Sequence, residues 1–127
     1  KKMIKELRTK DIKDFINQNP NSVLVDVRTS QEWENIGKPN GNKISLDTYF
    51  LSIKNINGEI NENFLEEFEN LKIDKETEIL VICKSGARSL LVSNLLNNQD
   101  YQCINIIDGF EGNEEGRGWK NEGLPII

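Results

Sequence analysis

The chain has 127 residues, of which 36% are hydrophobic and 29% are charged, a balance typical of one folded domain and not of a disordered segment. Its 16 basic and 21 acidic residues give a net charge of -5, which argues against a nucleic-acid partner or an anionic membrane surface, because both require a basic face. Histidine is absent, so a Ser-His-Asp triad, a Cys-His pair and a His-ligated zinc site are excluded.

No segment has the pattern of a membrane span or of a leader peptide. The longest apolar runs have four or five residues, far short of the ~20 that a transmembrane helix needs. Residues 1–6 lack the apolar stretch of a signal peptide, and Met3 behind two lysines leaves the true start open. The only cysteines are Cys83 and Cys103, so we expect a chain that does not depend on disulfides and a cytoplasmic location.

The first part of the chain is predicted to contain a weak strand, a helix and a strong strand. The weak strand lies near residues 3–7. Apolar residues at helical spacing within residues 12–16 then indicate a helix, with Thr9 as its candidate N-cap. The solid β-branched run at residues 23–27 predicts a strand that is buried on both faces.

Polar residues follow this strand at its carboxyl end. A buried Asp26 needs partners, which backbone amides or Arg28 would supply, and Arg28 is expected to pair with Glu32 one helical turn further on. Thr29 or Ser30 is expected to open a helix that has Glu32 in its first turn. Asp26, Arg28 and Glu32 are therefore predicted to be supporting residues, either bracing a nearby active loop or forming an ordinary structural cap.

The middle of the chain is less regular. A second weak strand is expected near residues 43–46. Residues 47–51 are a candidate helix whose aromatic side chains could line a pocket, with core packing as the favoured role. Acidic residues crowd residues 59–78 and are interpreted as a solvated helix face, beneath which an apolar stripe at residues 64–71 indicates the helix itself.

The last part returns to strands and helices in alternation. Solid apolar runs at residues 79–82 and 104–107 predict two more buried strands, and a helical stripe at residues 91–96 stops at Asn97. Such alternation implies right-handed crossovers and one α/β domain over residues 1–127, with a sheet of about five strands. Ligands bind at the carboxyl ends of the strands in such sheets.

The segment between strand 79–82 and the following helix contains the candidate chemistry. Cys83 stands at the carboxyl end of the strand and is followed by Lys84, Ser85, Gly86, Ala87, Arg88 and Ser89. The small residues allow a tight turn whose amides form an anion nest, and the helix adds its positive end. This environment should stabilise a thiolate without histidine, and Arg88 could grip an oxyanion with two hydrogen bonds. A lone cysteine that ends a strand is more often a small core residue, but the whole arrangement favours a functional thiolate.

These motifs together resemble the rhodanese domain family, with the tail of a bacterial single-domain subgroup. The resemblance covers about residues 5–126 and depends on the active loop and the Asp-Val-Arg motif jointly. The residues that carry it are Cys83-x4-Arg88 after a strand, Asp26-Val27-Arg28, Glu32-Trp33, Asp108-Gly109-Phe110-Glu111-Gly112, Trp119 and Gly123-Leu124-Pro125.

The resemblance implies a three-layer α/β sandwich with a mainly parallel sheet of about five strands and helices on both faces. It also implies transfer of sulfane sulfur through a persulfide on Cys83, the catalytic residue. The amides of residues 84–89 would line the pocket and stabilise that persulfide, Lys84 and Arg88 would orient an anionic donor, and Ser89 would hydrogen-bond the loop or the sulfur. The implied donor is thiosulfate or a persulfide, and the implied acceptor is cyanide, a small thiol or a protein thiol; neither a metal nor another cofactor is required.

Two other functions remain open at this point. The domain could be a sulfur-relay carrier or protein-binding module that does not use thiosulfate. Phosphatase chemistry on the same fold ranks lower, because the related phosphatases have one more residue in the loop, whereas four residues separate Cys83 from Arg88 here.

Three further features carry expectations of their own. Residues 36–42 replace the Gly-His-Ile-Pro-Gly-Ala pattern common in the family, which leaves the acceptor undetermined. The glycine-rich segment 109–118 is either a lid or a surface connection held by Phe110 and Trp119 in the core. Cys103 precedes its strand whereas Cys83 follows its own, so we expect opposite sheet edges, no disulfide between them, and a buried or inert Cys103.

Overall fold

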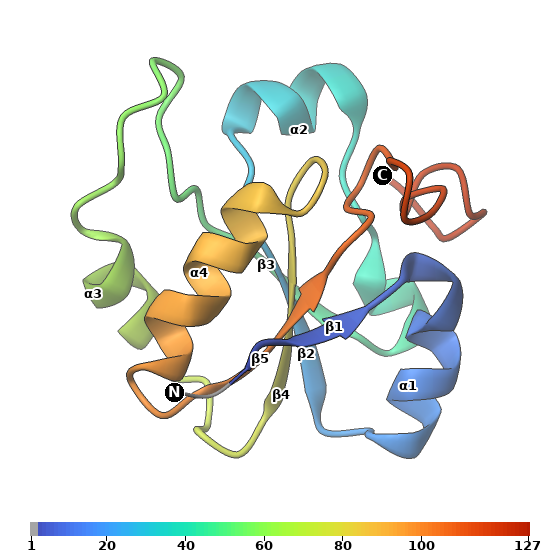
Figure 1. The fold of residues 1–127 in the computed structure, drawn as a ribbon, viewed down its shortest axis with the longest axis horizontal. Coiled ribbons are helices and arrows are strands. Elements are labelled where there is room, and N and C mark those ends of the chain that lie inside the picture. The colour runs from blue at the N-terminus through green and yellow to red at the C-terminus, as the bar shows by residue number, and fades with distance from the viewer. Residues whose placement is uncertain (1–2) are drawn as a thin grey trace.

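The computed structural model describes residues 3–127 and contains one five-stranded parallel sheet (Figure 1). Residues 1 and 2, part of the segment compared with a signal peptide, lie outside it. The elements in chain order are β1 Lys5–Leu7, the 3-10 helix η1 Thr9–Asp11, α1 Ile12–Gln18, β2 Ser22–Asp26, α2 Ser30–Ile36, the 3-10 helix η2 Gly41–Ile44, β3 Asp47–Phe50, α3 Phe64–Glu69, β4 Glu78–Ile82, α4 Ala87–Asn97 and β5 Gln102–Ile106. The strand order is β1-β5-β4-β2-β3, and every pair is parallel. No helix within residues 3–127 is long and apolar enough to cross a membrane.

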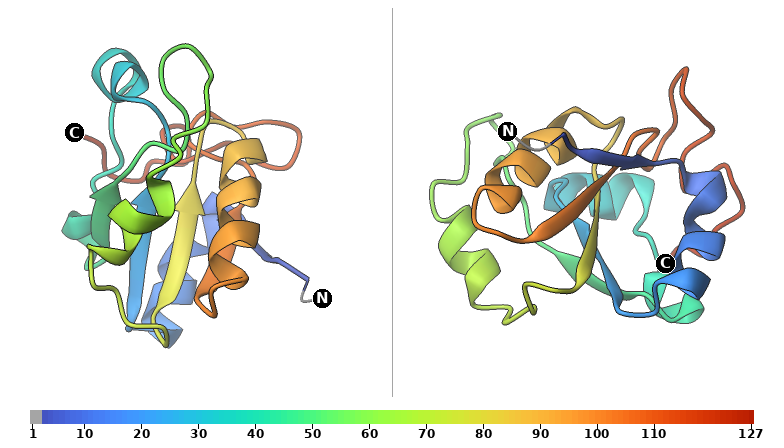
Figure 2. Two further views of the ribbon diagram at one scale, coloured as in Figure 1. Left: turned by 90° about the vertical axis from the view of Figure 1, so that its left-hand side faces the viewer. Right: turned by 60° about the horizontal axis from the view of Figure 1, so that its bottom comes forward.

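Each central strand contributes side chains alternately to two cores, one on each face of the sheet. On one face, Val23, Val25 and Val81 pack with the apolar sides of α3 and α4. On the other, Leu24 and Leu80 pack with α1 and with the C-terminal segment. Figure 2 shows α3 and α4 on one side of the sheet and α1 on the other. The predicted three-layer α/β fold is therefore confirmed.

Two predictions for the middle of the chain were wrong. Residues 43–46 are not a strand: residues 43 and 44 belong to η2, residue 45 is in a turn, and the Leu46 amide donates to the Gly41 carbonyl. The strand is β3, at the residues expected to be helical, and it pairs with β2 from Val23↔Asp47 to Asp26↔Phe50. Its β-branched and aromatic residues suit a half-buried edge strand, so sheet pairing overrides the short helical pattern.

Two local predictions at other elements also need correction. Thr9 does not cap α1: the N-cap is Asp11, without a side-chain bond, and the Thr9 hydroxyl instead donates to the buried carboxylate of Asp108. Cys103 lies within β5 and not before it. It is in register with Ile79 at the start of β4, whereas Cys83 follows the end of β4, so the two thiols do lie toward opposite edges of the sheet.

Candidate active site

Cys83 lies at the carboxyl edge of the sheet, between the end of β4 and the start of α4. The residue is only 1% exposed. Its sulfur accepts hydrogen bonds from the Gly86 amide at 3.1 Å and from the Ser89 amide at 3.3 Å, and lies 3.2 Å from the Ser89 hydroxyl. Two backbone amides therefore point at one sulfur, an arrangement that can hold an anionic group there.

Gly86 makes this turn possible. Its φ of 103° lies in the region that favours glycine, and a Cβ there would come within 2.8 Å of the Ile107 carbonyl oxygen. The turn leaves Lys84, Ser85 and Ala87 exposed at the mouth of the loop, while Gly86 is buried.

The back of the loop is held by residues 105–113, which we call the strap. Four successive carbonyl groups of the loop accept hydrogen bonds from it. These bonds run from the Phe110 amide to Cys83 O at 2.8 Å, from the Glu111 amide to Lys84 O at 3.1 Å, from Asn113 Nδ2 to Ser85 O at 2.9 Å and from Asn105 Nδ2 to Gly86 O at 3.2 Å. Because the strap holds the carbonyls on one side, the loop amides are free to point toward the sulfur.

The core anchors the strap from behind. Phe110 and Trp119 are both fully buried, as expected for a surface connection fixed in the core. Gly109 packs directly on the Lys84 carbonyl, where a Cβ would collide with it. The strap therefore supports the loop from its carbonyl side.

Arg88 is already paired within the protein. Its Nη1 donates to Glu32 Oε1 at 2.7 Å and its Nη2 donates to Glu32 Oε2 at 2.9 Å. Burial alone would raise the pKa of Glu32, but the hydrogen bonds and charge of Arg88, with the hydrogen bonds from Thr29, outweigh it and lower that pKa to about 2. The same hydrogen bonds raise the pKa of Arg88. Glu32 thus contacts the active loop directly.

The expected pairing of Arg28 with Glu32 was wrong. Arg28 folds back onto Asp26, with Nε 3.1 Å from both carboxylate oxygens and Nη2 at 2.9 Å, and both residues are fully buried. Asp26 and Arg28 are two positions apart, which is not the spacing of an ion pair on a helix. Their side chains can meet because β2 ends at Asp26 and the backbone turns directly after it. The Arg28 guanidinium also stacks 4.1 Å from the Phe110 ring, which links this pair to the strap.

Asn105 is a site residue that the sequence prediction missed. It lies in β5, where its Oδ1 accepts from the Ser89 hydroxyl at 2.5 Å while its Nδ2 donates to the Gly86 carbonyl. Asn105 thereby connects the two residues that contact the Cys83 sulfur. One signal was available: a single polar residue interrupts the apolar run 104–107 beside the strand that ends at Cys83.

Cys103 takes no part in this site. It is buried, it is a free thiol, and burial raises its pKa to about 12. Within the described part of the chain, no cluster of three His, Cys, Asp or Glu side chains could hold a metal ion.

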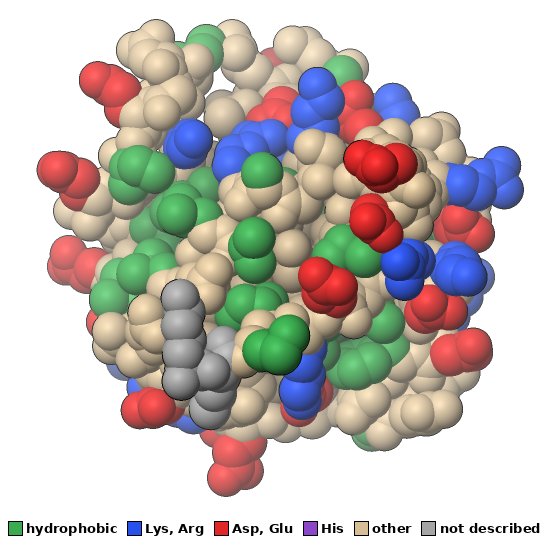
Figure 3. All heavy atoms as spheres, in the orientation of Figure 1, with side chains coloured by type: hydrophobic (Ala, Val, Ile, Leu, Met, Phe, Trp, Pro, Cys, Tyr) green, Lys and Arg blue, Asp and Glu red, His purple; other side chains and the backbone are tan. Residues whose placement is uncertain are grey.

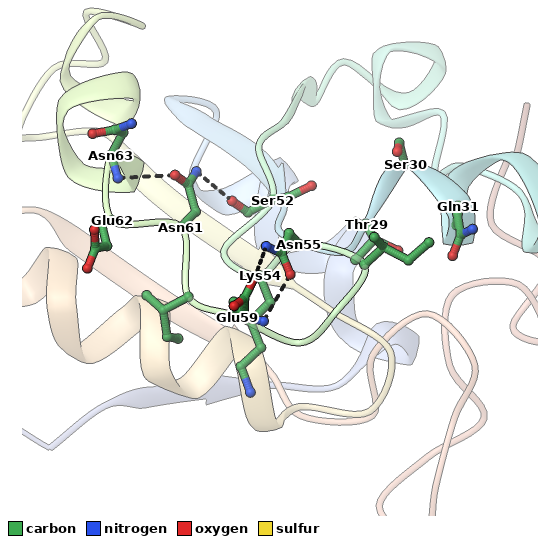
Figure 4. Close-up of a pocket in the computed structure, with 12 residues that line it drawn as sticks. Thr29, Ser30, Gln31, Ser52, Lys54, Asn55, Glu59, Asn61, Glu62 and Asn63 are labelled. Atoms are coloured by element: carbon green, nitrogen blue, oxygen red, sulfur yellow. Dashed lines mark hydrogen bonds between the residues drawn. The ribbon is translucent and has the colours of Figure 1, made fainter.

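A hollow of about 970 Å³, lined by both polar and apolar side chains, opens at the same edge of the sheet (Figure 4). Residues 29–31 form one wall and residues from the 52–63 loop form the other, with Lys54, Glu59 and Glu62 among them. The loop is held by its own asparagines, since Asn55 and Asn61 bond backbone and side-chain groups nearby. Thr29 lines the hollow and also donates two hydrogen bonds to Glu32, so the hollow and the Glu32–Arg88 pair share a residue.

Comparison with known proteins shows which proteins the chain is similar to. A model of the rhodanese-like domain matches residues 9–115. The uncharacterised protein RP600 of Rickettsia prowazekii is 45% identical over 112 residues, which cover 84% of each chain. The adenylyltransferase and sulfurtransferase UBA4 of Debaryomyces hansenii is 30% identical over 99 residues, 76% of this chain and 20% of that protein. The crystal structure of Rv0390 from M. tuberculosis superimposes with a TM-score of 0.83 at 28% identity and covers 99% of this chain and 98% of that one.

Proposed function

This chain belongs to the rhodanese-like domain family, and from that premise we propose that it is a sulfurtransferase that carries sulfane sulfur as a persulfide on Cys83. The observation that carries the proposal is the pair of backbone amides, from Gly86 and Ser89, that donate hydrogen bonds to the Cys83 sulfur within 3.3 Å. A relative named as a sulfurtransferase supports the same chemistry.

The proposed reaction has two half-reactions. The Cys83 thiolate attacks the outer sulfur of a thiosulfate or persulfide donor; a new S–S bond forms, the donor's S–S bond breaks, and sulfite or a thiolate leaves with the electron pair. An acceptor, such as cyanide, a small thiol or a protein thiol, then attacks the terminal sulfur and releases the Cys83 thiolate. The Gly86 and Ser89 amides would stabilise the anionic sulfur in both steps, because fixed donors cost no reorganisation.

The other residues have supporting roles in this proposal. Lys84 would attract an anionic donor, and Arg88 would add only part of its charge because Glu32 already holds its guanidinium. The exposed side of Ser85 and Ala87 would leave room for the donor. Asp26 and Arg28 do not touch the sulfur, so we propose that they brace the strap through Phe110.

Mass spectrometry of the intact protein tests the proposal. Wild type incubated with thiosulfate or a small persulfide is expected to gain one sulfur atom, and cyanide should remove it as thiocyanate. Cys83→Ser is expected to gain none, and Cys103→Ala, the matched control at the second thiol, is expected to behave as wild type. A folded wild-type protein that takes no sulfur from either donor would contradict the proposed activity and favour a protein-binding or phosphatase-like role.

A further inference from the structure

The charges around Cys83 are largely balanced within the protein. Arg28 is paired with Asp26, and Arg88 is paired with Glu32 by two hydrogen bonds. Figure 3 shows Lys and Arg side chains beside the upper end of α4 with acidic side chains among them, and not as a uniformly basic patch. The loop itself adds only the exposed Lys84.

Glu32 is held firmly in its place against Arg88. The Thr29 amide and hydroxyl both lie 3.1 Å from Glu32 Oε1, and the Glu32 amide returns a bond to the Thr29 hydroxyl. This capping box fixes the carboxylate on α2, and the pair with Arg88 is only 20% exposed on each side. An anion that enters the site would have to displace the Glu32 carboxylate from the two Nη groups of Arg88, or come close to that carboxylate.

Thiosulfate is disfavoured by this arrangement more than a persulfide is. Thiosulfate carries two negative charges, both close to the sulfur that Cys83 attacks, so its charge comes near Glu32 during the reaction. A thiol persulfide carries at most one charge at its sulfur, and its carrier group can extend away. Like charges brought together in a partly desolvated site repel more strongly than in water.

The hollow beside Glu32 offers space that thiosulfate does not need. Its volume is about 970 Å³. The side chains that line it include the positively charged Lys54 and the negatively charged Glu59 and Glu62. Side chains of both signs suit a zwitterionic carrier such as an amino-acid or short-peptide thiol. The shared residue, Thr29, places this space next to the ion pair.

We propose that Glu32 is a specificity-determining residue that weakens the use of small dianions, and that the sulfur donor is the persulfide of a small zwitterionic thiol whose carrier lies in the hollow. This inference rests on the proposed sulfurtransferase function. In the step it assigns, R–S–SH and the Cys83 thiolate give Cys83–S–SH and R–S⁻: one S–S bond forms, one breaks, and the thiolate leaves with the electron pair.

The test measures, for each donor, the concentration that half-loads Cys83 with sulfur in a fixed time. The donors are thiosulfate and glutathione persulfide, and the proteins are wild type, Glu32→Gln and Glu34→Gln. Glu34 is exposed on the same helix and is the matched control. Wild type should need more thiosulfate than persulfide. Glu32→Gln should lower the thiosulfate requirement roughly three- to tenfold, as loss of one partly buried ion pair allows.

A lower thiosulfate requirement in Glu32→Gln distinguishes the proposed role of Glu32 from a purely structural one. If Glu32 merely positions Arg88, its replacement raises the thiosulfate requirement or leaves it unchanged, and either result overturns the inference while the sulfurtransferase function stands. Glu32→Ala is a second variant with the same expectation, should the first fail to fold. If neither donor loads wild-type Cys83, the proposed function falls and this inference falls with it.

A substitution of Lys54, the positively charged side chain that lines the hollow, tests the placement of the carrier separately. Lys54→Ala should raise the glutathione persulfide concentration needed for half-loading severalfold, because the carrier's carboxylate loses its partner, and it should reduce the preference over thiosulfate. An unchanged persulfide requirement would overturn the placement of the carrier in the hollow.

Discussion

At the scale of single residues, Asn105 joins the groups that position the Cys83 sulfur. It bonds the Ser89 hydroxyl and the Gly86 carbonyl at once. Asn105→Ala would leave both without a partner in a buried site, which should cost about 1–3 kcal/mol of unfolding free energy. It should also slow sulfur loading, because Gly86 and Ser89 supply the hydrogen bonds to the sulfur. Urea unfolding and loading rates measure the two effects, with exposed Asn35→Ala as control. Unchanged loading in a destabilised protein would limit Asn105 to a structural role.

The Glu32–Arg88 pair gives the stability of the protein a defined dependence on pH. The folded pKa of Glu32 is lowered from 4.5 to about 2, so its stabilising contribution is complete above the unfolded value and is lost as the pH falls toward 2. Partial exposure and solvent screening reduce that contribution to about 1–2 kcal/mol. Glu32→Gln should therefore lower stability at pH 7 but flatten the stability curve between about pH 4.5 and pH 2 relative to wild type. Denaturant unfolding across this range measures it, and parallel curves for the two proteins would contradict the prediction.

At the scale of elements, the strap determines the shape of the active loop. Gly109 has a φ of 63° and packs directly on the Lys84 carbonyl, whereas a Cβ added at Gly123, which has a φ of 81°, would meet no other atom within 4 Å. Gly123→Ala should cost about 1 kcal/mol for its backbone conformation alone. Gly109→Ala should cost clearly more and also slow sulfur loading, because the strap must move away from the loop. Equal stability losses in the two variants, measured by denaturant unfolding, would show that the packing of the strap on the loop contributes nothing.

At the scale of the whole molecule, the sequence predicted those features that depend on local pattern. The runs at residues 23–27, 79–82 and 104–107 are buried on both faces, so their composition alone predicts parallel strands. The loop after Cys83 was also predictable, because a strand, a glycine and a helix follow one another directly in sequence. β3 was not, since an edge strand of four residues is decided by its pairing with β2.

The partners of the charged side chains were harder to predict than the positions of the strands. Glu32 and Arg88 are 56 residues apart and meet only because α2 and α4 both begin at the carboxyl edge of the sheet. The strap contacts the loop in the same way, through bonds that sequence spacing does not reveal. Long-range hydrogen bonds of this kind depend on where the folded sheet brings its loops, so local pattern could not predict them.

The sheet also separates the two thiols of the molecule, which leads to a prediction about oxidation. Cys103 is in register with Ile79, and Cys83 comes four positions after Ile79, directly beyond the end of β4, a separation of about 13 Å in the strand direction. A disulfide requires Cα atoms within about 7 Å, and both thiols are buried in the folded protein. Treatment with diamide should therefore produce no intrachain disulfide, so that two free thiols per chain are titrated after denaturation and removal of the oxidant. The same treatment in denaturant, where the constraint of the sheet is gone, should allow the bridge to form. An intrachain disulfide formed under native conditions would contradict the parallel register of β4 and β5, on which the placement of the candidate site depends.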